Sequence, residues 1–125
     1  MKTYIHILVL FFSLSVFSQV EKIEPPFWWS GMQNSELQLM CYGKNIAQFE
    51  ISISDGITVL NRKKTENPNY QFITIDTKGI APGEVTISFS KKGKVLFSKS
   101  YAFKKRRQNS ALRKGFDASD AMYLI

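Results

Sequence analysis

The chain has 125 residues, of which 17 are Lys or Arg and 10 are Asp or Glu, and its formal net charge is +7. It has one histidine, His6, which lies in an N-terminal apolar segment, and one cysteine, Cys41. The remainder of the chain therefore has no histidine to activate a Ser or Cys nucleophile, and no His/Cys set to hold zinc. A single cysteine also excludes an intramolecular disulfide.

Residues 1–18 have the layout of a secretory signal peptide. Lys2 supplies the positive start, an apolar run interrupted only by His6 follows, and Ser18 is a small residue at the expected cleavage point. The run is shorter than the ~20 residues of a membrane span. We expect cleavage after Ser18 and export to the periplasm or the outside of the cell, with no membrane attachment of the mature chain. A retained membrane anchor is the alternative.

The body of the chain shows the patterns of short β-strands. Apolar and polar residues alternate in residues 36–42, 49–54 and 84–90, and residues 70–76 and 95–103 are rich in β-branched and aromatic side chains. Asp55-Gly56 predicts a two-residue hairpin to the following ITVL segment, and the KKGK sequence at 91–94 predicts a second hairpin.

Polar and turn-forming residues separate these strands. NRKKTENPN (61–69) is expected to be a polar loop, and KGIAPG (78–83) a turn. No stretch of ten or more residues before Phe103 has helical periodicity.

This succession predicts an all-β domain over residues 19–103, an immunoglobulin-like β-sandwich of about seven strands. The cysteine pair of antibody domains is absent, so the disulfide-linked subtype is excluded. A small β-barrel is the alternative. We expect Cys41, within the apolar run LQLMCY, to be a buried small residue of the core.

The C-terminal part of the chain breaks this pattern. Residues 104–118 read as a basic linker, because residues 104–125 hold six basic and two acidic residues, against ten and eight in residues 19–103. No helix or stacking motif for nucleic acid accompanies this charge, so nucleic acid is not an expected partner. Residues 119–125 end in AMYLI, an apolar run typical of a strand buried on both faces.

AMYLI has no evident partner within the sandwich. We interpret residues 119–125 as the beginning of a further domain, and expect them to promote self-association of the chain. The alternative is that AMYLI folds back as an edge strand of the sandwich.

Two adjacent tryptophans, Trp28 and Trp29, follow a pair of prolines. Neighbouring side chains of an extended segment point to opposite faces, so the two rings cannot enter the same core together. One ring is expected to be buried, and the other to contact a sugar or a neighbouring domain. Tyr42, on an outward position of its strand, is a third candidate for the same surface.

Two separated motifs resemble one known family. EPPFWWSGM (24–32) followed by ELQLMCYGKNI (36–46) is similar to the N-terminal domain of bacterial cyclomaltodextrinases and neopullulanases, in the alpha-amylase family of glycoside hydrolases. RKGFDASDAMYLI (113–125) is similar to the start of that family's catalytic (β/α)8 barrel, with AMYLI as its first strand. The resemblance implies that the remainder of the barrel is missing.

The resemblance implies an accessory role for the domain, without catalysis by the chain as it stands. In that family the two catalytic carboxylates come from later barrel strands, and such enzymes hold the pair ~5–5.5 Å apart. We assign no catalytic residue, since Asp117 and Asp120 are expected to be turn or capping residues, and no metal or cofactor.

The implied partners are a catalytic barrel or second subunit and an alpha-glucan oligosaccharide, such as a maltodextrin or cyclodextrin, with Trp28, Trp29 and Tyr42 as contacts. A free-standing exported sandwich that binds a polysaccharide or a protein is the alternative.

Overall fold

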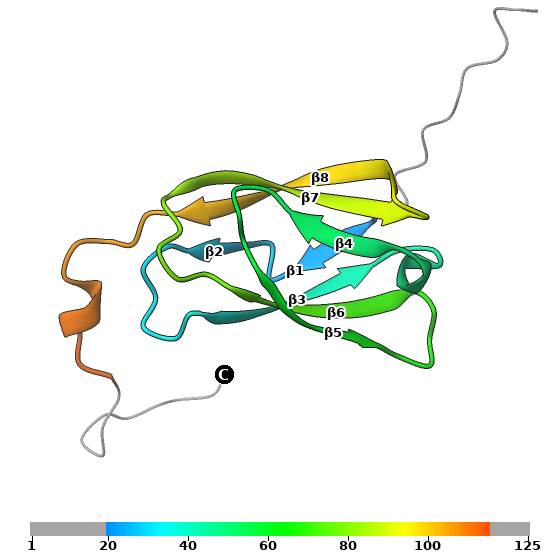
Figure 1. The fold of residues 1–125 in the computed structure, drawn as a ribbon. Coiled ribbons are helices and arrows are strands. Elements are labelled where there is room, and N and C mark those ends of the chain that lie inside the picture. Colours follow the sequence, from blue (N-terminus) through cyan, green and yellow to red (C-terminus); the bar gives the residue numbers. More distant parts are fainter. Residues whose placement is uncertain (1–19, 116–125) are drawn as a thin grey trace, which may run out of the picture.

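The computed structural model describes residues 20–115 (Figure 1). The predicted signal peptide (1–18) and the apolar segment 119–125 lie outside these residues. Two four-stranded sheets form two layers, which confirms the β-sandwich. They share no strand pairing in the described part of the chain, so the structure is not a barrel.

The first sheet has the order β1-β3-β6-β5, formed by β1 (Lys22–Glu24), β3 (Glu36–Tyr42), β6 (Tyr70–Asp76) and β5 (Val59–Lys64). The second sheet has the order β2-β8-β7-β4, formed by β2 (Phe27–Trp29), β8 (Lys94–Lys104), β7 (Gly83–Lys91) and β4 (Glu50–Ile53). Two short 3₁₀ helices, η1 (Ile46–Gln48) and η2 (Ser110–Leu112), follow β3 and β8.

The core lies between the two layers and is built by period-two alternation. In β3 the buried residues are Leu37, Leu39 and Cys41, and their neighbours point outward. β6 and β7 alternate in the same way, and the fully buried side chains include Ile51, Ile73, Ile75, Ile87 and Phe89. The alternation that predicts β3 and β7 in the sequence is therefore the one that fills the core, and β6, predicted from its β-branched and aromatic residues, follows the same pattern.

One buried polar side chain closes the η1 end of the sandwich. Gln71 on β6 is 1% exposed. With its amide oriented to donate, Nε2 hydrogen-bonds to the carbonyl oxygens of Ile46 and Phe49, each at 3.2 Å. These bonds satisfy the amide nitrogen inside the core and fix η1 against the first sheet.

The predicted hairpin at Asp55-Gly56 is wrong. Both residues have positive φ, 59° and 71°, as the turn requires, but the turn carries the chain from one sheet to the other. β4 pairs with β7, whereas β5 pairs with β6. Turn residues set the local backbone, while burial of the apolar faces selects the partner strand.

One further expectation needs correction. Residues 61–64, expected in a polar loop, form most of β5, an edge strand whose exposed lysines discourage pairing with other chains. The described residues form eight short strands, in keeping with the sandwich of about seven strands expected from the sequence, and β1 and β2, of three residues each, are not among the predicted strands. The hairpin at 91–94 is confirmed, with Lys92 and Gly93 at positive φ between β7 and β8.

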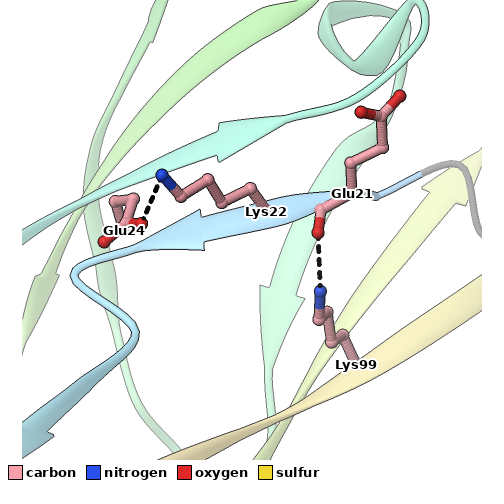
Figure 2. A network of polar contacts seen from close by, with 4 residues as sticks. All are labelled: Glu21, Lys22, Glu24 and Lys99. Carbon is pink, nitrogen blue, oxygen red and sulfur yellow. Dashed lines mark hydrogen bonds and ion pairs between the residues drawn. The ribbon is translucent and has the colours of Figure 1, made fainter.

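Two polar contacts involve the N-terminal segment, and one of them reaches the second sheet. Lys22 and Glu24 of β1 form an ion pair of 2.7 Å, which raises the pKa of Lys22 by a hydrogen bond and by the nearby negative charge. Lys99 of β8 donates to the carbonyl oxygen of Glu21 at 3.2 Å (Figure 2). The segment that leads into β1 is thereby tied to the second sheet as well.

Candidate functional site

The aromatic segment Phe27-Trp28-Trp29 forms β2, at the edge of the second sheet. β2 pairs in parallel with the end of β8, placing Trp28 opposite Phe103 and Trp29 opposite Lys104. Beyond β2, the backbone N–H of Ser30 donates to the carbonyl oxygen of Lys104 at 3.0 Å. The aromatic segment is therefore held on a regular strand, and its side chains alternate between the two faces of the sheet.

Trp28 is the inward ring. It is half-buried and packs against the core cluster. Its indole Nε1 is buried without a hydrogen-bond partner among the described residues, as is the hydroxyl of Tyr101. Trp28 therefore serves as the edge of the core and offers no polar group to a ligand.

Trp29 is the outward ring and is 39% exposed. Phe27 lies on the same face, and the two rings meet edge to face with centroids 5.2 Å apart. The ammonium of Lys104 lies 3.4 Å from the centroid of Phe27, a cation–π contact. Phe27 is therefore covered on one side by Lys104 and Trp29, while Trp29 keeps a surface free for another contact.

A groove of about 480 Å³ lies beside Trp29. We call it the aromatic-basic groove. It is lined by Phe27, Trp29, Met32, Lys104, Arg106, Arg107, Ser110 and Arg113. Four of these side chains are cationic and none is acidic, so the groove combines apolar rings with a positive potential.

Two features of the chain after β8 bring the cations to this groove. Arg106 donates from its guanidinium to the carbonyl oxygen of Gly31 at 3.0 Å, which ties the residues after β8 to the turn after β2. η2 then turns the chain, with Ser110 and Leu112 N–H groups donating to the carbonyl oxygens of Arg107 and Asn109. The described part of the predicted basic linker therefore lies beside Trp29.

Tyr42 does not join this surface. It lies on β3 in the first sheet, whereas Trp29 lies on the second. Tyr42 faces Tyr70 across the β3–β6 pair, with ring centroids 4.9 Å apart. The structure thus brings Trp28 and Trp29 together, with Phe27, and places Tyr42 in a separate cross-strand pair.

Sequence reasoning missed Phe27, Met32 and the groove arginines. Side chains alternate along residues 27–29, and this alternation predicts that Phe27 lies on the same face as Trp29. No sequence signal indicates that Arg106, Arg107 and Arg113 gather beside β2, because their positions depend on the hydrogen bond from Arg106 to Gly31 and on the turn at η2.

A second hollow, of about 550 Å³, lies between residues 55–58 and 76–85. Its carboxylates are used locally. Asp55 accepts a hydrogen bond from Ser54 Oγ, Asp76 from the backbone N–H of Lys78, and Glu84 from Ser100 Oγ. Within residues 20–115 no group of three or more His, Cys, Asp or Glu side chains is placed to hold a metal ion.

Two reactive side chains of the described residues, Cys41 and Tyr101, are enclosed. Cys41 is 0% exposed, and burial raises the pKa of its thiol to about 12, so the reactive thiolate is disfavoured. Burial likewise raises the pKa of the Tyr101 hydroxyl. No helix within residues 20–115 is long and apolar enough to cross a membrane.

Fold and surface together define a β-sandwich module that presents an edge-strand tryptophan beside a basic connector. The family model described as "Cyclomaltodextrinase, N-terminal" matches residues 22–107, which comprise all eight strands and most of the groove. The chain therefore belongs to the cyclomaltodextrinase N-terminal domain family, as the motifs within residues 24–46 indicate. Asp117, Asp120 and AMYLI lie outside both the match and the described residues.

Proposed function

We propose that this chain serves as the N-terminal accessory domain of an amylase-type glycoside hydrolase, and that its Trp29 surface packs against the catalytic barrel of that enzyme. Family membership supports the accessory role. By packing there, the domain shapes one wall of the substrate cleft and supplies no reacting group. Pairing with a second subunit at the same surface is a variant of this role.

One observation carries the choice of a protein partner. The exposed ring of Trp29 lies among four cationic side chains, with no carboxylate among the described residues that line the groove. Neutral glucans present hydroxyl groups and apolar CH faces, and sites for them need no such charge. A protein surface supplies both the apolar area and the acidic side chains. Full burial of an exposed large apolar side chain contributes about 1.5–3 kcal/mol, so burial of the 39% of Trp29 that remains exposed contributes part of this and favours docking of the two domains.

The reading frame of the source DNA tests this role. We expect it to continue past the codon for Ile125 into several hundred codons that encode alternating strands and helices. A stop codon, with no such barrel encoded in the adjoining DNA, would contradict the accessory role and favour the free-standing binding module.

Glucan binding at Trp29 is the second candidate, and one observation favours it. A rigid indole exposed on a strand offers a flat apolar face with few rotatable bonds to immobilise, and the CH face of a pyranose ring fits such a surface. A maltooligosaccharide should then change the tryptophan fluorescence in a saturable way, and Trp29→Ala should abolish the change. Absence of a response in the wild-type chain would remove this candidate and leave the domain-packing proposal intact.

A further inference from the structure

The aromatic-basic groove has a charge that its own residues leave unbalanced. Lys104, Arg106, Arg107 and Arg113 line it, and Arg106 is held by a backbone carbonyl rather than by a carboxylate. We propose that the segment Phe116–Asp120 (FDASD) of this same chain occupies the groove, with its two carboxylates among the arginines and its phenyl ring against the apolar floor. This inference deepens the proposed function, on which it rests, by naming the first segment to contact the Trp29 surface.

Charge complementarity selects this segment. Asp117 and Asp120 are the only acidic residues after Glu84, and they follow directly on the residues that carry the groove cations. A carboxylate close to a guanidinium forms charge-assisted hydrogen bonds, which are stronger than bonds between neutral groups. FDASD has two such groups and no cation.

The connection between groove and segment is short enough for docking. Arg113 lines the groove, and Asp117 follows four residues later, a span of at most ~13–14 Å when extended. A partner attached by so short a connector is present at an effective concentration in the millimolar range. Weak individual contacts are therefore sufficient for the segment to occupy the groove.

The apolar part of the segment matches the floor of the groove. Phe116 immediately precedes Asp117, and the floor presents the free surface of Trp29 together with half-buried Phe27 and Met32. Docking of Phe116 removes apolar area on both sides from water while the carboxylates meet the arginines. A neutral glucan satisfies only the first of these two requirements.

The experiment measures how accessible Trp29 is in the full chain. A Trp28→Phe background leaves Trp29 as the sole tryptophan, and acrylamide, which is uncharged, serves as the fluorescence quencher. We expect Asp117→Asn with Asp120→Asn to raise the quenching constant about twofold. Sodium chloride at 0.5 M should raise the constant of the unsubstituted chain toward the same value, because salt screens surface charges.

Two matched variants separate docking from a general effect of charge. Glu50→Gln with Glu66→Gln removes the same number of carboxylates from exposed positions away from the groove, and should leave the quenching constant unchanged. Arg107→Gln with Arg113→Gln should reproduce the effect of the aspartate variant. Combining the aspartate and arginine substitutions in one chain should raise the quenching constant no further, because both pairs of substitutions remove the same interaction.

The proposal is overturned if the aspartate variant and the unsubstituted chain have equal quenching constants, or if the control pair raises the constant equally. Protection of Trp29 that increases with protein concentration would instead assign the groove to a second copy. Any of these results, combined with protection of Trp29 by a catalytic barrel, would overturn this inference alone. Loss of that protection as well would overturn the proposed function.

Discussion

Two aromatic pairs lie on the outer faces of this sandwich, and only one of them leaves a ring available. Tyr42 and Tyr70 face each other on neighbouring strands in the interior of the first sheet, and both are half-buried. Trp29 and Phe27 lie on β2, at the edge of the second sheet, and Trp29 is 39% exposed. A strand inside a sheet has neighbours on both sides that cover its aromatic residues, whereas an edge strand has one.

The contrast between interior and edge strands shows how a small β-domain acquires a contact surface. Aromatic residues on interior strands stabilise the fold itself, while aromatic residues on an edge strand remain free to contact another surface. The basic connector, turned back by η2, then adds charge beside the edge ring.

The largest expected effect contrasts a buried aromatic residue with the exposed one. Phe89 is 0% exposed and stacks on Phe97 with ring centroids 4.9 Å apart. Phe89→Ala should lower the free energy of unfolding by about 3–5 kcal/mol, since it leaves a cavity in the core. Trp29→Ala should lower it by less than about 1 kcal/mol. Urea denaturation of both variants measures the contrast, and equal losses would show that Trp29 is part of the core.

The buried thiol of Cys41, on the inward face of β3, should make the free energy of unfolding depend on pH. The Cys41 thiol stays protonated in the folded state up to a pKa of about 12, whereas an unfolded thiol ionises near pH ~8.5. The stabilisation is thus complete below the unfolded pKa and is lost as pH rises toward 12. Its slope reaches about 1.4 kcal/mol per pH unit.

Denaturation between pH 8 and pH 11 measures this slope. Cys41→Ala serves as the control, and should retain only a shallower decline that begins near the ordinary pKa of tyrosine, because Tyr101 is also buried. An unchanged slope in the Cys41→Ala variant would show that the thiol is accessible in the folded state.

The smallest effect concerns the tyrosine pair itself. A double-mutant cycle with Tyr42→Ala and Tyr70→Ala should give a coupling energy of about 0.5–1 kcal/mol, typical of cross-strand aromatic pairs. A coupling energy of zero would mean that the two rings do not stabilise each other. It would contradict the contrast between the paired tyrosines and the exposed ring of Trp29.

The sequence predicts the parts of this fold in which local pattern and burial agree. β3 and β7 follow from alternation, β6 follows from its β-branched and aromatic residues, and the β7–β8 hairpin follows from Lys92-Gly93. The Asp55-Gly56 prediction fails because the same turn backbone serves a crossing between sheets. Strand partners depend on contacts between distant residues, which a local pattern does not contain.

The candidate site is likewise predicted from the sequence where local pattern decides, and not where contacts between distant residues decide. Alternation predicts that Trp28 and Trp29 point to opposite faces, but it cannot say which ring is outward. That depends on the pairing of β2 with β8, about 75 residues away, as the partnership of Trp28 with Phe103 shows. The aromatic-basic groove depends on η2 and on the hydrogen bond between Arg106 and Gly31, so composition alone predicts a basic linker and not the groove.

We propose that the Trp29 surface packs against the catalytic barrel. The most direct measurement compares acrylamide quenching of Trp29, in the Trp28→Phe background, between this chain and the same chain joined to or mixed with its amylase-type barrel. We predict that the barrel lowers the quenching constant several-fold, as expected for a ring that becomes enclosed. An unchanged quenching constant in a complex shown to be assembled would contradict the claim.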